Sequence, residues 1–149
     1  MSNNRVISNI DFFTLVEEEI KEGKSVTIPF KGNSMYPFIR SDKYIITLTP
    51  IKEELKINDI ALFKYRGEHL LHRLIEIKGN KYLFRGDGSI IQEELVERAD
   101  IIAILARITT LDGKECRRDT FFWKQSHKLW QKLFPIRRYL IRILRIFFK

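Results

Sequence analysis

Between residues 25 and 110 the chain consists of short runs rich in apolar and β-branched residues, each ended by a turn-forming group. Runs of this length, separated by Gly, Asn, Asp and Ser, are typical of strands. The pattern predicts six strands in a compact, mostly antiparallel β body. Their ranges are 25–30, 43–51, 59–65, 69–77, 81–86 and 100–110. Residues 92–100 depart from the pattern and are expected to form a helical turn or a loop.

Apolar residues take helical spacing on both sides of this region. One short helix is expected over residues 10–23, with an apolar face formed by Phe12, Leu15, Val16 and Ile20. Near the carboxyl end, Pro135 separates two further amphipathic helices. The sequence therefore predicts a mainly β domain with a short N-terminal helix over residues 1–113, and an amphipathic helical tail over residues 114–149.

The net charge of +8 comes entirely from the tail. Residues 1–113 hold 16 Lys and Arg against 17 Asp and Glu, whereas residues 114–149 hold 11 against 2. In the last helix a narrow cationic stripe lies opposite a wide apolar arc, and Trp123 and Trp130 precede it. This composition is typical of a helix that lies flat on anionic lipid.

We therefore expect residues 119–149 to bind an anionic membrane surface, as a peripheral attachment on the cytoplasmic face. Two alternatives stay open for the tail, which are packing on a partner protein and folding back onto the β body. Nucleic acid is disfavoured as a partner, because the apolar arc would then be left exposed.

Other features narrow the class of protein. A single cysteine, Cys116, leaves no intramolecular disulfide to form, and no metal framework or cofactor motif is evident. The amino terminus lacks the basic-then-apolar run of a signal peptide. No uncharged apolar stretch approaches the roughly 18 residues that a membrane-spanning helix needs. The chain is expected to be soluble or bound to a surface.

Three polar residues stand where chemistry could take place. Ser34 lies in a turn, and a serine hydroxyl is a weak nucleophile until a base takes its proton. Strand alternation puts His72 on the same face as Leu70 and Leu74 and turns His69 to the other face. Asp87 follows a glycine in a tight turn. Taken singly, the three are a turn former, a core histidine and a turn aspartate.

Together, four stretches of residues 26–108 resemble the signal peptidase I superfamily, which also includes the self-cleaving SOS and phage repressors. They are "GNSMYPFIRSD", "LKINDIALFKY", "LLHRLIEIKGNKYLFRGDGS" and "IIAILARI", in the family's order. The resemblance implies the coiled β-sheet fold of that superfamily. Because His72 precedes Arg73 where other members carry lysine, the chain is similar to the histidine-type branch of the endoplasmic reticulum and archaea.

The resemblance also implies roles for individual residues. Ser34 would attack the scissile carbonyl, His72 would act as general base, and Asp87 would fix the histidine tautomer. Glu93 stands six residues after Asp87, where the histidine branch carries a second aspartate. Gly32 stands where lysine-type enzymes have a hydroxyl residue, so backbone N–H groups would hold the oxyanion. Met35, with Pro37, would brace the loop from beneath.

The function expected from this resemblance is a serine endopeptidase that removes a leader or signal segment from a protein or peptide. Its substrate would enter as an extended strand, with small residues before the cut. Two other functions stay open. One is a catalytically silent binding module of the same fold, and the other is a regulatory protein that cleaves only itself. The last is the less expected, because the 25 residues before the β body are too few to hold a helix-turn-helix domain.

Overall fold

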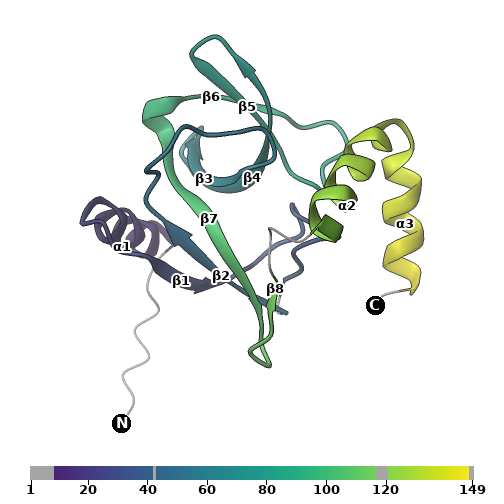
Figure 1. Cartoon of the computed structure of the whole chain (residues 1–149), viewed down its shortest axis with the longest axis horizontal. Coiled ribbons are helices and arrows are strands. Elements are labelled where there is room, and N and C mark those ends of the chain that lie inside the picture. Colours follow the sequence, from purple (N-terminus) through teal and green to yellow (C-terminus); the bar gives the residue numbers. More distant parts are fainter. Residues whose placement is uncertain (1–8, 42, 117–120, 148–149) are drawn as a thin grey trace.

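In the computed structural model, which describes residues 9–41, 43–116 and 121–147, an antiparallel sheet curls into a half-barrel (Figure 1). The strand order is β1-β2-β7-β3-β4-β5-β6, and β8 pairs with β7. The strands are β1 Val26–Pro29, β2 Tyr44–Thr49, β3 Ile60–Tyr65, β4 Glu68–Lys78, β5 Lys81–Arg85, β6 Glu94–Glu97, β7 Ile101–Thr110 and β8 Glu115–Cys116. The mainly β fold class is thereby confirmed.

Each of the six predicted strand ranges overlaps a strand of the sheet. The prediction for residues 92–100 is only partly right, because β6 occupies Glu94–Glu97 and a single 3₁₀ turn follows at Arg98–Asp100. Along β6 the side chains of Glu94 and Val96 are buried, and their neighbours are exposed. This places a carboxylate inside the protein at a position where the sequence predicted no strand.

Helix α1, Asn9–Lys21, packs against the sheet near β1 (Figure 1). It buries Val16 and Ile20 against a core cluster that extends to β7. Met35 and Ile39, from the loop after β1, are fully buried in the same cluster. A second core cluster, which includes Phe63, Leu74 and Phe84, fills the space among β3, β4, β5 and β6. The loop that contains Ser34 is thus fixed to the first core.

The tail consists of α2 Phe121–Lys132, a 3₁₀ turn at Phe134–Ile136 and α3 Arg137–Phe147, on the opposite side of the sheet from α1 (Figure 1). It folds back onto the β body. Trp130 and Ile141 are buried in a third cluster with Tyr36, which lies two residues after Ser34. The side chain of Trp123 lies outside the described residues. Within the part of the chain that the structure covers, none of the helices has the length and apolarity needed to cross a bilayer.

Helix α3 therefore presents three faces rather than the two expected from the sequence. The face toward the β body contains Arg137 and Ile141, with Leu140 and Leu144 beside them. A second apolar strip is exposed and consists of Tyr139, Ile143, Ile146 and Phe147. The cations Arg138, Arg142 and Arg145 lie between these two faces. Packing on the β body buries only part of the apolar arc of α3. The rest of the arc stays exposed on the surface.

Replacement of Trp130 by alanine should destabilise the protein, because it removes a buried indole that contacts the loop of Ser34. We expect a loss of about 3 kcal/mol in the free energy of unfolding, measured by urea denaturation. The matched control is Leu129→Ala, since Leu129 is 60% exposed whereas Trp130 is 7% exposed. The control should change stability by no more than about 0.5 kcal/mol. Equal losses in both variants would show that α2 is not docked through Trp130.

Candidate active site

Ser34 lies at the outside of a turn whose underside is anchored in the core. Gly32, with a φ of +97°, takes the left-handed conformation that glycine adopts without strain. Ser34 is exposed, whereas Met35 is fully buried. The N–H of Ile39 donates to the carbonyl of Met35 at 3.0 Å. Met35 thus braces the loop from beneath, as the sequence predicts.

The turn contributes two backbone donors next to the candidate nucleophile in the chain, the N–H groups of Ser34 and Met35. In the described part of the chain, the N–H groups of Ser34 and Met35 donate to no other backbone carbonyl outside the regular elements. Backbone N–H groups next to a nucleophile are the usual donors to an oxyanion. The loop therefore offers donors for this role although Gly32 carries no side-chain hydroxyl.

His72 is buried on β4 and is oriented by a buried carboxylate. Its Nδ1 lies 2.8 Å from Oε2 of Glu94, which projects from β6 and is fully buried. The ring packs edge-on against Phe63, with 6.0 Å between the centroids. When Nδ1 carries the proton it donates to Glu94, and the lone pair of Nε2 is then free to accept a proton.

Gly86 separates the histidine ring from the loop of Ser34. A Cβ added at Gly86 would lie 3.1 Å from Nε2 of His72 and only 2.4 Å from the carbonyl oxygen of Ser34. The Nε2 edge of the imidazole and the backbone of Ser34 therefore meet at the same glycine. Among the described contacts no hydrogen bond joins Ser34 to His72. Catalytic hydrogen bonds are often long in a free enzyme and tighten when the substrate binds.

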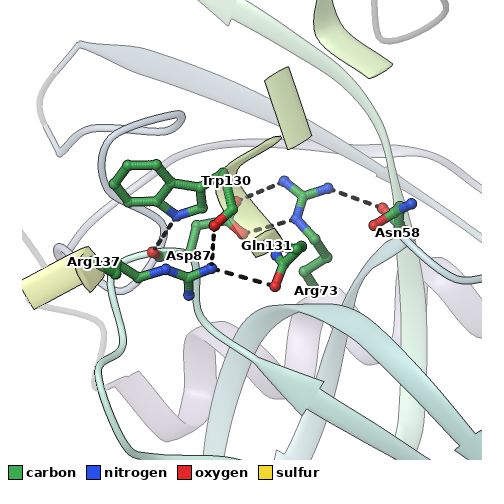
Figure 2. A network of polar contacts seen from close by, with 6 residues as sticks. All are labelled: Asn58, Arg73, Asp87, Trp130, Gln131 and Arg137. Atoms are coloured by element: carbon green, nitrogen blue, oxygen red, sulfur yellow. Dashed lines mark hydrogen bonds and ion pairs between the residues drawn. The ribbon is translucent and has the colours of Figure 1, made fainter. Parts of the chain in front are cut away.

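The Asp87 carboxylate pairs with Arg73 (Figure 2) and Glu94 is the carboxylate on His72, so the prediction that Asp87 fixes the histidine tautomer is wrong. Its buried carboxylate accepts two hydrogen bonds from Arg73, from Nε at 2.8 Å and from Nη2 at 2.6 Å. Arg73 is itself 1% exposed and also donates to the carbonyl of Asn58. Breaking a buried pair of this kind leaves an uncompensated charge, which is strongly unfavourable. Asp87 holds the residue next to His72 rather than His72 itself.

The other carboxylate singled out in the sequence, Glu93, lies apart from His72. It forms an ion pair with Arg85 instead. Glu94, one residue later, is the carboxylate that reaches the imidazole. Sequence reasoning missed Glu94 because residues 92–100 were not expected to form a strand. Had β6 been recognised, alternation would have placed Glu94 and Val96 on one face.

The backbone of the Asp87 turn connects the tail to the loop of Ser34. The N–H of Gly88 donates to the carbonyl of Ser34 at 2.8 Å. The indole N–H of Trp130 donates to the carbonyl of Asp87 at 2.9 Å (Figure 2). A Cβ at Gly88 would lie 2.4 Å from the carbonyl oxygen of Asn33. The turn therefore touches the candidate nucleophile loop on one side and α2 on the other.

Arg137 adds a buried cation at this junction (Figure 2). Its guanidinium donates to the carbonyl of Trp130 at 3.1 Å and to Oε1 of Gln131 at 3.3 Å. Burial lowers the pKa of Arg137 to about 10, although the nearby Asp87 raises it and Arg85 and Arg73 lower it further. The group thus stays charged at neutral pH, and the ionised Asp87 partly compensates its charge.

A cavity of about 460 Å³ opens beside Ser34, between α1 and the face of the sheet that includes Leu62 and Leu71. His69 lines this cavity whereas His72 does not, which agrees with the predicted alternation of the two histidines along β4. In the part of the chain that the structure covers, no three His, Cys, Asp or Glu side chains gather closely enough to hold a metal ion.

The site thus combines the buried His72–Glu94 pair with Ser34, which also lines the cavity. This set of groups can in principle carry out acyl transfer through a serine nucleophile and an oriented histidine base. A scan against protein-family models finds no match to this chain, and comparison with curated proteins finds none either.

Proposed function

We propose that this protein is a serine endopeptidase that cleaves an extended peptide or protein precursor. Ser34 is the nucleophile, His72 is the general base and Glu94 orients the imidazole. The observation that carries the proposal is the buried His72–Glu94 hydrogen bond of 2.8 Å, with the Nε2 edge of the ring facing the glycine that touches Ser34. The four sequence stretches similar to the signal peptidase I superfamily support the same reading, including its coiled-sheet fold.

In the proposed reaction, Nε2 of His72 takes the proton of Ser34 as the oxygen attacks the scissile carbonyl. The carboxylate of Glu94 stabilises the imidazolium that forms. The N–H groups of Ser34 and Met35 would hold the oxyanion. His72 then returns its proton to the leaving amine, and a water molecule activated by the same ring hydrolyses the acyl-enzyme. Each proton is passed between Ser34, His72, substrate and water, and Glu94 remains ionised.

An extended substrate fits the free edge of the sheet. β1 is the first strand in the sheet order and pairs only with β2 in the described chain. The carboxyl-terminal end of β1 leads into the loop of Ser34. Addition of a peptide as a further strand would supply main-chain hydrogen bonds and present every second side chain to the cavity. Leader or signal segments of precursors, which are extended before cleavage, are the substrates this arrangement suits.

We also propose that the exposed strip of α3 binds an anionic membrane surface as a peripheral attachment. Ile143 is 50% exposed, Ile146 73% and Phe147 76%, which makes them a continuous apolar strip one helical turn apart. The cations Arg138 and Arg142 flank it. An apolar strip beside arginines is the composition that inserts at the boundary between head groups and acyl chains. The opposite face of α3 stays on the β body, so binding does not require the tail to undock.

The catalytic proposal predicts that Ser34→Ala abolishes cleavage and that Glu94→Gln lowers kcat by roughly 10²-fold or more, because the amide no longer stabilises the imidazolium. The assay is incubation of the full chain with a proteome-derived peptide mixture, and mass spectrometry to identify new termini. Glu93→Gln is the matched control, since Glu93 pairs with Arg85. It should leave kcat close to that of the wild type.

Two outcomes would contradict this proposal. If Ser34→Ala still generates the same new termini, Ser34 is not the nucleophile. If Glu93→Gln lowers kcat as much as Glu94→Gln, the loss does not come from the His72 hydrogen bond. Binding of extended peptides without any cleavage by the wild type would instead favour the silent binding module.

The membrane proposal predicts that the full chain floats with vesicles of phosphatidylcholine and phosphatidylglycerol, and floats less at high salt. Each arginine near an anionic surface contributes about 1 kcal/mol, and that attraction is screened within a Debye length. The double variant Ile143→Ser, Ile146→Ser should lose most flotation. A matched control replaces Ile57 and Ile77, which are exposed on the β body, by serine. Flotation that is the same for both double variants would contradict a role for α3.

A further inference from the structure

The cavity beside Ser34 is apolar on almost every side. Phe12 and Phe13 of α1 form one wall, and Leu62 and Leu71 of the sheet belong to its floor. Its volume of about 460 Å³ falls in the range of small-ligand pockets and exceeds what an alanine side chain could fill. The cavity thus offers space for a side chain of much greater size next to the nucleophile.

The α1 wall is held in place by specific contacts. The ring of Phe13 stacks on His69 with 4.4 Å between centroids and 5° between planes. Nε2 of His69 lies 2.8 Å from Oε1 of Glu17, and Nζ of Lys64 lies 2.8 Å from the same oxygen. Burial alone would raise the pKa of Glu17, but hydrogen bonds from Lys64 and His69 lower it overall. The ionised Glu17 therefore ties α1 to β3 and β4.

The charges at the cavity exclude one class of side chain. Lys31 and His69 are the basic residues among those that line the cavity. No carboxylate is among the described residues that line it. A lysine or arginine side chain of a substrate would therefore lose its hydration without gaining a partner.

We propose that this cavity binds a bulky apolar side chain of the substrate, such as phenylalanine or leucine, close to the bond that Ser34 attacks. Phe13 of α1 is then a specificity-determining residue. The inference rests on the proposed peptidase function and extends it. The proposed side chain is larger than the small ones that the family resemblance implies, because the space beside α1 is much larger than a methyl group. Filling that space with apolar surface is favourable, and a smaller side chain would leave part of the wall without contact.

The test measures binding separately from catalysis. ¹⁵N-labelled Ser34→Ala protein is titrated with the N-acetyl amides of phenylalanine, leucine, alanine and lysine, and backbone chemical shifts are followed by NMR. The phenylalanine and leucine amides should shift the signals of Phe12, Phe13, Ile28 and Leu71. They should bind at least about tenfold more tightly than the alanine amide, since a single methylene in a hydrophobic pocket can already change affinity by roughly tenfold. The lysine amide should bind most weakly.

Two variants on one helix provide the matched comparison. Phe13→Ala should weaken binding of the phenylalanine amide severalfold, because it removes part of the wall. Leu15→Ala, on the same helix but 52% exposed and away from the cavity lining, should not. Circular dichroism checks that both variants fold. Equal effects of the two variants would overturn the assignment of Phe13.

Other outcomes separate this inference from the proposed function. Affinity that does not depend on side-chain size, or no shift with any of the amides, overturns the inference. Tighter binding of dodecanoate than of every amide, at the same signals, overturns it in favour of a lipid pocket. If the wild type cleaves peptides that have no bulky apolar residue near the cut, the inference is overturned but the proposed peptidase function stands. If the protein binds the bulky amides selectively but cleaves no peptide, the pocket assignment is supported and the peptidase function is contradicted.

Discussion

Gly86 and Gly88 have no space for side chains, because the backbone of the Ser34 loop lies directly against them. A Cβ at Gly86 or at Gly88 would lie 2.4 Å from a backbone carbonyl of that loop, which no side chain tolerates without a backbone shift. Between the two glycines, Asp87 directs its carboxylate to Arg73 and its carbonyl to the indole of Trp130. Close backbone approach on one side and a buried ion pair on the other thus determine where Ser34 stands relative to His72.

This turn explains why the tail belongs to the site although none of its residues takes part in the proposed chemistry. Trp130 and Ile141 cover Tyr36 in the loop, and Arg137 places a buried cation near Asp87. The tail therefore supports the loop with its inner face and leaves an apolar strip with arginines on the outside. In the proposed function these two faces connect a membrane surface to the position of the nucleophile through a single helix, α3.

The sequence predicted most of the sheet but only part of the site. Six strands could be recognised because their apolar runs end at clear turns, and Ser34 and His72 could be singled out from their surroundings and the family resemblance. The carboxylate could not, because Glu94 faces inward while Leu95 is 44% exposed, which reverses the usual distribution of apolar and charged residues. Amphipathicity likewise showed that the tail has an apolar arc without showing that part of the arc packs on Tyr36. Such choices depend on partners distant in the sequence.

The central claim is that Glu94 holds His72 with the proton on Nδ1, so that Nε2 faces Ser34 as a base. The most direct measurement is a long-range ¹H–¹⁵N NMR spectrum of the imidazole rings, recorded on the wild type and on Glu94→Gln at a pH where His72 is neutral. The account predicts that neutral His72 is protonated on Nδ1 in the wild type, and that this preference is lost in the variant. A neutral His72 that carries its proton on Nε2 in the wild type would contradict the account, since that ring could not accept the proton of Ser34.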